Sequence, residues 1–246
     1  QKTGMSALAC KLREFPRMGL ARLPTPLEPL HRLTEYLNGP RLWAKREDLI
    51  GVGFGGNKVR KLDFVLAEAI AADADTLVSG GVEQSNSQRQ IAACAARLGL
   101  HCHLAVYHGR LEQSDEEYSE SGNALLNKFY GAHFHHFQWT GHRNDHIREV
   151  AHALDMRGHT TYVVPYGVSS PLGAIGYSSV IVELVEQSTA MGFCPSAIVH
   201  ASGSAGTQAG LVVGTSMCLD RTRVLGIDID AEPDRVKQDV MSLAES

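Results

Sequence analysis

Lys58 is the residue whose type and position best suit chemistry. It follows the glycine-rich turn Gly53-Phe54-Gly55-Gly56, and Asn57 just before it can cap a helix. Apolar residues then recur at helical spacing, at Val59, Leu62, Leu66 and Ile70. Burial and a positive helix end both disfavour an ammonium group, so the pattern predicts a lowered pKa for Lys58 and a nucleophilic amine. Lys61, one turn later, could hold an anion, although a surface helix with two solvated lysines has the same pattern.

A second candidate is the run Ser202-Gly203-Ser204-Ala205-Gly206-Thr207 between a predicted strand and a predicted helix. Small residues let backbone N–H groups converge on an anion, and the hydroxyls of Ser204 and Thr207 add donors. The run therefore predicts a phosphate cradle, with a tight strand–helix turn as the alternative. It matches neither the dinucleotide pattern Gly-x-Gly-x-x-Gly nor a Walker loop.

A third candidate is the polar run Gln84-Ser85-Asn86-Ser87-Gln88-Arg89-Gln90 at the start of an otherwise apolar helix. Neutral hydrogen-bonding groups at a positive helix end suit a carboxylate or a polar ring substituent. A segment that merely caps the helix would look the same, and the run alone does not separate the two interpretations.

Metal and hydrolase chemistry find little support in the sequence. Five of the twelve histidines form one group, His133, His135, His136, His142 and His146. On a strand, His133 and His135 share a face that His136 does not, and no cysteine or pair of carboxylates completes a ligand set. We therefore predict a solvated strand edge and no metal. The five cysteines contain no Cys-x-x-Cys pair, and neither Gly-x-Ser-x-Gly nor His-Glu-x-x-His occurs.

The elements that carry these residues alternate between strands and helices. Strands are predicted at residues 42–45, 76–79, 101–107, 132–137, 160–164, 197–200 and 224–229. Helices are predicted near 30–37, from Lys58 onward, at 85–98, 122–130 and 143–157, from the loop 165–173 to about 191, from 206 onward and at the end of the chain. This alternation predicts an α/β protein with parallel sheets covered by helices on both faces. No linker marks a boundary, so a second domain would be an insertion.

Composition narrows the class of protein. The 246 residues are 43% hydrophobic and 20% charged, enough for a sizeable core in one large or two small domains. A net charge of -4 without a long basic run argues against nucleic-acid binding and favours small-molecule partners. The sequence shows no membrane-spanning run and no signal peptide, which predicts a cytoplasmic protein. Gln1 to Gly4, ahead of Met5, are interpreted as a remnant before the natural start and are left out of the fold prediction.

Four segments taken together resemble a known family. They are Lys45-Arg46-Glu47-Asp48, residues 55–62, Gln84-Ser85-Asn86 with Arg89-Gln90, and residues 201–207 with Ala209-Gly210. In this order they resemble the tryptophan-synthase-β-like (fold type II) pyridoxal-phosphate enzymes. The similarity is greatest to the group of D-cysteine desulfhydrase, L-cysteate sulfo-lyase and 1-aminocyclopropane-1-carboxylate deaminase, and it covers the chain from about residue 12 onward.

The resemblance implies a role for each candidate. Lys58 would be the Schiff-base lysine and Lys61 a phosphate contact, while the loop of Gly203, Ser204, Ala205, Gly206 and Thr207 would hold the phosphate. Asn86 would face the ring hydroxyl of the cofactor. Ser85, Asn86 and Ser87 would receive the substrate carboxylate, with Tyr166 on the substrate side. Lys58 or a neighbouring hydroxyl, Ser85, would move a proton at carbon.

The resemblance also implies an activity and a domain plan. The activity would be elimination of a β-substituent, sulfide or sulfite, from a small amino acid such as D-cysteine or L-cysteate, giving pyruvate and ammonia. Deamination of 1-aminocyclopropane-1-carboxylate to 2-oxobutyrate and a truncated, non-catalytic homologue are the alternatives. A small α/β domain, residues 59–166, would be inserted into a large cofactor-binding domain of residues 1–58 and 167–246. Members of the family are commonly homodimers.

Departures from the family pattern fall near the predicted substrate side. Glu83 replaces an aliphatic residue, Ser87 replaces a larger polar residue, and Tyr166-Gly167-Val168 replaces a loop that usually has two glycines. Relatives also continue for about 80 to 90 residues beyond the point where this sequence stops, which is most of a small domain. The large domain is therefore expected to lack its C-terminal part, which normally supplies the partner of the pyridine nitrogen and an active-site tyrosine.

Overall fold

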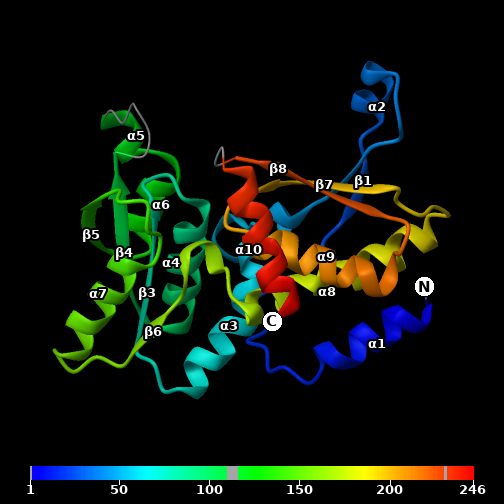
Figure 1. Ribbon diagram of the computed structural model, residues 1–246. Helices are drawn as coiled ribbons and strands as arrows, with labels where there is room; N and C mark the ends of the chain where they lie inside the picture. Colours follow the sequence, from blue (N-terminus) through cyan, green and yellow to red (C-terminus); the bar gives the residue numbers. More distant parts are fainter. Residues whose placement is uncertain (1, 110–115, 230–231) are drawn as a thin grey trace.

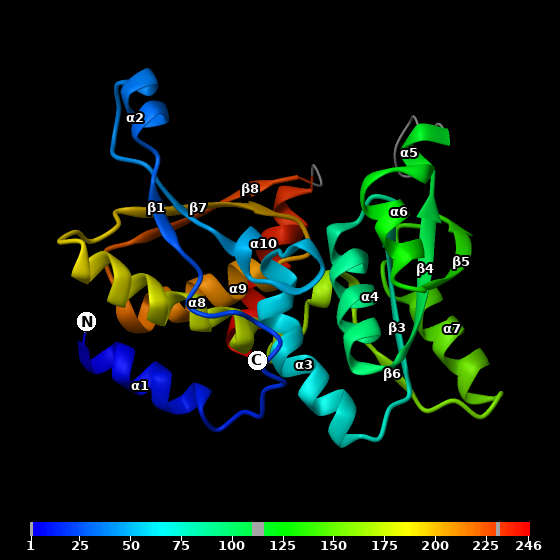
Figure 2. The same ribbon diagram turned by 180° about the vertical axis from the view of Figure 1, so that it is seen from behind.

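The computed structural model describes residues 2–109, 116–229 and 232–246 and contains three sheets (Figures 1 and 2). The largest sheet is parallel, with strand order β5-β4-β3-β6. Its strands are β3 (Thr76–Val82), β4 (His101–His108), β5 (His133–Gln138) and β6 (Thr161–Val163). A parallel pair joins β7 (Ala197–Ser202) to β8 (Arg223–Asp228), and an antiparallel pair joins β1 (Leu27–Pro29) to β2 (Trp43–Lys45).

Helices cover both faces of the four-stranded sheet. On one face, Leu104 and Val106 of β4 belong to the same core as α4 (Asn86–Leu98), and α6 (Gly122–Phe129) packs on α4. Successive strand residues point to opposite faces, so Ala105 and Tyr107 join the core of α7 (Asp145–Asp155) on the other side. A short helix, α5 (Glu116–Glu120), leads into α6.

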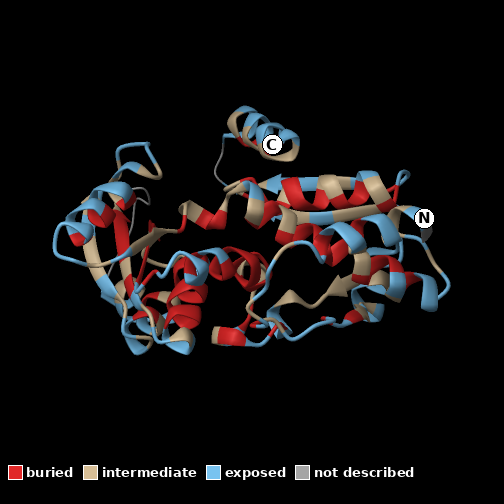
Figure 3. Cartoon of the chain, turned by 90° about the horizontal axis from the view of Figure 1, so that it is seen from below, coloured by how far each residue is buried: buried red, intermediate tan, exposed pale blue. Residues whose placement is uncertain are grey.

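A second group of helices lies against one face of the β7–β8 pair, whose other face exposes Val199, Leu225 and Ile227. Helix α8 (Pro171–Ala190) packs closely on α9 (Gly206–Cys218), and both contact α1 (Lys2–Leu12). Helix α10 (Pro233–Glu245) lies on α9. Helix α2 (His31–Leu37), between β1 and β2, projects away from the rest of the molecule (Figure 1). Figure 3 shows buried segments gathered inside each helix group and exposed segments on the outer helix faces.

Helix α3 (Asn57–Ala71) connects the two helix groups. Its residues Val59, Leu62 and Leu66 pack with α4 and β3, whereas Phe64 packs with α8. Three one-turn helices complete the chain: η1 (Glu47–Leu49), η2 (Val52–Phe54) and η3 (Tyr166–Val168). The first two precede α3 and the third precedes α8. Among the helices that the structure describes, we find none long and apolar enough to cross a membrane.

A buried ion-pair network fixes the start of α3. Arg60 is only 1% exposed, and its guanidinium pairs with Glu47 at 2.7 Å and with Glu183 of α8 at 2.8 Å. Lys45 pairs with the same Glu183 at 2.6 Å. Because breaking such a buried pair leaves an uncompensated charge, the network holds η1, α3 and α8 in one arrangement.

The predicted α/β class with a parallel sheet is confirmed, and the predicted strands and helices match to within a few residues. Two local predictions were wrong. Residues before Met5 were left out of the fold, yet Thr3 and Gly4 belong to α1. Helix α3 begins at Asn57 with Gly56 as its N-cap, so Asn57 does not cap it. The structure also adds α1, α5 and β1, which the sequence did not predict.

Candidate functional site

A cavity of about 710 Å³ gathers most of the predicted site residues. Its wall is formed by the starts of α3 and α4, by η3, and by β7 with the turn that follows it. Sequence-predicted residues on this wall are Lys58, Ser85, Asn86, Ser87, Tyr166, Gly203, Ser204, Ala205 and Thr207. Lys61 and Gly206 do not line this cavity, which we call the main cavity, but lie directly behind its wall.

Lys58 lies in the first turn of α3 and faces the main cavity. Its ammonium donates to Asn57 Oδ1 at 3.3 Å. Burial lowers the pKa of Lys58 from its ordinary value of 10.5 to about 8. The lowered pKa agrees with the sequence prediction, and it leaves about 10% of the amine neutral at pH 7.

Gln90 of α4 caps the start of α3. Its side-chain oxygen Oε1 accepts from the backbone N–H groups of Lys58 at 2.8 Å and Val59 at 3.1 Å. These are two of the donors that a helix leaves without partners at its first turn. The cap comes from a residue on a different helix, so Asn57 is free to donate from Nδ2 to Thr207 Oγ1 at 2.8 Å.

Lys61 is completely buried behind the cavity wall. Its ammonium donates to Gly167 O at 3.3 Å, and burial together with the positive charge of Lys58 holds its pKa well below the ordinary value. A Cβ atom added to Gly206 would lie 3.0 Å from Lys61 Nζ. The ammonium therefore lies against the first residue of α9, where only a glycine leaves this space.

The turn between β7 and α9 brings small residues to the wall of the main cavity, next to Lys61. Ala205, the N-cap of α9, has φ of 68°, and Gly206 begins the helix. Gly206 N donates to Ser169 Oγ at 3.2 Å, and that hydroxyl donates to Ser204 O. Ser202 is buried, and its hydroxyl has no partner among the described residues. The arrangement is that of an anion cradle at a helix N-terminus, with Lys61 behind it.

The polar run at the start of α4 divides into two sets. Ser85 is the N-cap, accepting from Gln88 N at 3.4 Å, and it lines the main cavity with Asn86 and Ser87. Gln88, Arg89 and Gln90 point elsewhere. The guanidinium of Arg89 donates to Gly55 O at 3.0 Å and to Gly53 O, so it holds the glycine turn rather than facing the cavity. The first set of this run faces the cavity, and the second set makes hydrogen bonds that support the fold.

Tyr166 connects the cavity to the start of α7. Its backbone N–H donates to Asn144 Oδ1 at 3.0 Å, and the guanidinium of Arg143 lies over its ring, 5.1 Å from the centroid. Arg143 also donates to Gly203 O at 3.4 Å. The two walls that carry Tyr166 and Gly203 are thus joined by one arginine.

The cavity wall also has residues that were not predicted as site residues, among them Lys45, Glu47, Tyr177 and His200. His200 lies on β7, and burial together with the positive charges of Lys58 and Lys61 lowers its pKa. The signal that could have found His200 was a polar residue on the strand that leads into the predicted anion loop. Glu47 and Lys45 could have been found through the charged run after β2.

Glu83 does not face the main cavity, which corrects its placement on the substrate side. Its carboxylate instead accepts from Ser119 Oγ at 3.0 Å, on the other side of the loop after β3. The histidines of β5 lie on an edge strand, where His135 Nε2 contacts His103 Nδ1 at 2.9 Å. In the described part of the chain, no three histidine, cysteine or carboxylate residues meet in a way that could hold a metal.

The main cavity fits a phosphate ester that also carries an aldehyde. Lys58 offers an amine with a lowered pKa, and the β7–α9 turn offers an anion cradle backed by Lys61. The unpartnered hydroxyls of Ser87 and Ser202 leave hydrogen-bonding capacity at the wall, counted over the described residues. Pyridoxal phosphate has both groups that these features complement.

Solved structures with the same fold support this interpretation. An ACC deaminase homologue superposes with a TM-score of 0.81 at 29% identity, over 98% of this chain and 73% of that one. A threonine deaminase from T.th. superposes with a TM-score of 0.65 at 24% identity, over 94% of this chain and 66% of that one, which shows the fold alone.

Curated relatives are similar in sequence to most of this chain. The D-cysteine desulfhydrase of Serratia proteamaculans (strain 568) is 42% identical over 219 residues, which are 89% of this chain and 66% of that protein. The D-cysteine desulfhydrase of Yersinia enterocolitica (serotype O:8 / biotype 1B) is 40% identical over 233 residues, 95% of this chain and 70% of that protein. The chain thus spans about two thirds of the length of these relatives. A family model described as "Pyridoxal-phosphate dependent enzyme" matches residues 19–242, and the chain belongs to this family.

Proposed function

We propose that the protein is a pyridoxal-phosphate-dependent lyase that eliminates sulfide or sulfite from a small amino acid such as D-cysteine or L-cysteate. The observation that carries the proposal is the pairing, in one cavity, of Lys58 with an anion cradle. The similarity to proteins named D-cysteine desulfhydrase supports the choice of substrate. The products are pyruvate, ammonia and the leaving group, and a water molecule supplies the keto oxygen of pyruvate.

Pyridoxal phosphate would be held by Lys58, Lys61, Asn86 and the loop of residues 203–207. Bound there, it supplies an electron sink for negative charge at the substrate Cα. Lys58, with its pKa near 8, holds and moves the proton at Cα, because its neutral form is accessible near neutral pH. Lys61 and the first N–H groups of α9 place positive charge where the phosphate would lie.

The substrate carboxylate would lie at the start of α4. Ser85, Asn86 and Ser87 present hydrogen-bonding side chains there, and the positive helix end favours an anion. The Ser85 hydroxyl is the second group that could move a proton, and Tyr166 closes the cavity from the opposite wall. These assignments predict that Ser85 and Tyr166 affect substrate binding more than cofactor binding.

The proposal includes a domain plan, an assembly and a location. Residues 59–166 form the small domain, inserted into a large domain of residues 1–58 and 167–246, with the main cavity between them. The protein acts as a homodimer in the cytoplasm. The position of α3, which packs on both helix groups, supports the placement of the domain junction just after Lys58. Light scattering of the purified protein tests the dimer.

Product analysis tests the activity. The wild-type protein, supplied with pyridoxal phosphate, is expected to release sulfide and pyruvate in equal amounts from D-cysteine, or sulfite and pyruvate from L-cysteate. Lys58→Ala abolishes the release, whereas Lys237→Ala, which removes an exposed lysine of α10, leaves it unchanged. Cofactor binding without any turnover would support a non-catalytic homologue instead.

A second candidate is deamination of 1-aminocyclopropane-1-carboxylate to 2-oxobutyrate and ammonia. The superposition on an ACC deaminase homologue favours it. The same assay separates the two, because this substrate gives 2-oxobutyrate and D-cysteine gives pyruvate with sulfide. Production of 2-oxobutyrate without sulfide release from either cysteine enantiomer would replace the desulfhydrase proposal.

A further inference from the structure

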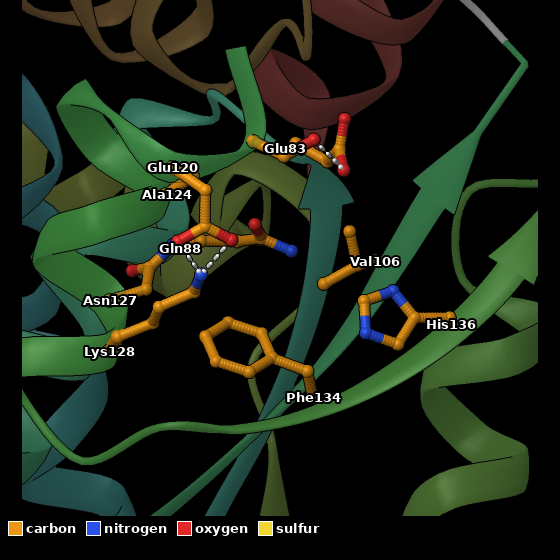
Figure 4. Close-up of a pocket in the computed structure, with 10 residues that line it drawn as sticks. Glu83, Gln88, Val106, Glu120, Ala124, Asn127, Lys128, Phe134 and His136 are labelled. Carbon is orange, nitrogen blue, oxygen red and sulfur yellow. Dashed lines mark hydrogen bonds and ion pairs between the residues drawn. The ribbon is translucent and has the colours of Figure 1, made fainter. Parts of the chain in front are cut away.

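A second cavity, of about 200 Å³, lies beside the four-stranded sheet (Figure 4). It sits on the α4 and α6 side of the four-stranded sheet, and none of its lining residues lines the main cavity. We call it the lateral pocket. It is lined by Glu83, Gln88, Val106, Ser119, Glu120, Ala124, Asn127, Lys128, Phe134 and His136.

Gln88 presents an unpartnered oxygen at the lateral pocket. The side chain is 0% exposed, and its Nε2 donates to Gly81 O and to Ala105 O, both at 3.2 Å. These two carbonyls can only accept, so they fix the amide nitrogen, and Oε1 must be the other atom. Oε1 has no partner among the described residues. In Figure 4 the amide end of Gln88 lies between Glu83 and Phe134.

Asn127 adds a second unpartnered oxygen. It is 1% exposed, and its Oδ1 has no partner in the part of the chain that the structure describes. Buried carbonyl oxygens normally accept a hydrogen bond, so two of them beside one cavity indicate an occupant with N–H or O–H donors. The two oxygens would also meet the need of an ordered water for two to four polar partners, so the apolar residues Val106, Ala124 and Phe134 on the wall are what favour an organic occupant over water.

The charges around the lateral pocket favour a cation. Lys128 is paired with Glu120 at 2.6 Å, so its charge is already compensated. Glu83 is mostly buried, and its neighbours are the Ser119 hydroxyl and His108 Nδ1, the latter at 3.5 Å. His108 Nε2 in turn contacts His136 Nδ1 at 2.7 Å. The carboxylate of Glu83 is therefore the charge that an occupant would meet.

We propose that the lateral pocket binds a small organic ammonium ion with a short apolar chain. Its N–H groups donate to Gln88 Oε1 and Asn127 Oδ1, and its charge is balanced by Glu83. The chain packs on Phe134, whose ring face also attracts a cation. Such a ligand supplies donors, charge and apolar surface, which are the three properties that this wall complements.

An occupant would contact the helix that carries the predicted substrate residues. Gln88 reaches the lateral pocket with its side chain, and its backbone N–H donates to the Ser85 hydroxyl at 3.4 Å in the main cavity. Glu83 lies two residues before Ser85. An occupant of the lateral pocket would therefore contact residues next to Ser85 that hold it in position. The inference does not depend on the activity proposed above.

Titration calorimetry with propylammonium tests the proposal, with propanol and propionate as matched probes. The protein is loaded with pyridoxal phosphate, and its visible band is recorded at each addition, because amines can also react with the cofactor in the main cavity. We expect saturable binding of propylammonium with Kd of about 1 mM, given its few atoms. Propanol and propionate should bind at least about tenfold more weakly, as expected when charge is required.

Two variants test whether propylammonium binds in the lateral pocket. Ala124→Leu fills the cavity and Glu83→Gln removes its charge, so each should weaken propylammonium binding about tenfold or more. Ala153→Leu, at an exposed position of α7, is the control and should leave binding unchanged. Circular dichroism checks folding, and if Ala124→Leu does not fold, Glu83→Gln decides.

Three results would overturn the proposal. They are no saturable heat up to about 20 mM propylammonium, equal binding of propanol, or binding that neither variant weakens. The source of a natural ligand is then separated by comparing propylammonium with alanine. Tighter binding of alanine that Glu83→Gln weakens indicates a free amino acid, and tighter binding of propylammonium indicates a simple amine.

Discussion

Two of the helices that border the main cavity, α3 and α4, begin in different ways. Helix α4 is capped by its own Ser85, the residue immediately before it. Helix α3 has no side-chain cap from its own N-cap residue, and its first N–H groups are bound by Gln90 from α4. The cap of α4 is specified by the residue next to it in sequence, whereas the cap of α3 forms only when the fold brings α4 beside it.

The difference has a chemical consequence. A local cap uses the polar side chain next to the helix start, and at α4 that same side chain, Ser85, faces the cavity. At α3 the distant cap leaves Asn57 free for Thr207 and leaves Lys58 free for the cavity. Lys58 is thus held by its backbone, and its side chain is not used to maintain the helix.

The largest expected loss of stability comes from removing Arg60, whose buried ion pairs hold the start of α3, and it is compared with the loss of a surface ion pair. Arg60→Met leaves the mostly buried Glu47 without its cationic partner and Glu183 with Lys45 alone, so it should cost about 3–5 kcal/mol of unfolding free energy. Arg46→Met, the matched control, breaks pairs with Glu28 and Asp48 at the surface and should cost at most about 1 kcal/mol. Urea unfolding measures both. Equal losses would contradict the view that Arg60 anchors α3.

The next effect tests the distant cap itself. Gln90→Leu removes the acceptor of two backbone donors and should destabilise the protein by about 2 kcal/mol. The variant should also bind pyridoxal phosphate more weakly, because the start of α3 loses its position. Gln238→Leu, at an exposed site of α10, is expected to change stability by less than about 0.5 kcal/mol. Unchanged cofactor affinity in Gln90→Leu would show that the cap does not position Lys58.

A smaller effect is expected at the local cap. Ser85→Ala should cost about 1 kcal/mol of stability, and Ser170→Ala, which removes the cap of α8, should cost about the same. Only Ser85→Ala should raise the KM for the amino-acid substrate, because Ser85 faces the main cavity. If both variants change KM alike, the role of Ser85 is that of a cap alone.

The comparison also predicts how the stability of the cofactor-free protein depends on pH. Lys58 has a pKa of about 8 in the fold and about 10.5 when unfolded, so the unfolded state binds more protons between these values. Stability should therefore rise as pH increases from 8 toward 10.5, and this contribution should be absent in Lys58→Met. Thermal unfolding across this range measures it, and an identical rise in both proteins would assign it to other groups.

The sequence predicts what depends on local pattern and chemical type. It indicates the α/β alternation, the Ser85 region as a helix start, and three sets of residues that the fold collects around one cavity. It does not indicate the cap of α3, because Gln90 approaches only in the folded state. For the same reason Asn57 was assigned a role that Gln90 performs, and Glu83 was placed on the wrong side of its loop.

Burial is the second property that the sequence left open. Lys61 and Arg60 lie in the same helical turn, where the sequence alone does not say whether a charged side chain is exposed, and the fold buries both. The charge of Arg60 is compensated by two carboxylates, whereas Lys61 lies against Gly206, in the turn between β7 and α9. His200 was missed because a histidine on a strand carries no signal until the strand is placed beside Lys58 and Lys61.

The most direct test of the account is to identify the residue that binds pyridoxal phosphate. The protein is incubated with the cofactor, reduced with borohydride and digested, and the modified peptide is located by mass spectrometry. We predict a visible cofactor band before reduction and a single modified residue, Lys58, with both lost in Lys58→Ala and retained in Lys237→Ala. Modification of another lysine, or a band that persists in Lys58→Ala, would contradict it.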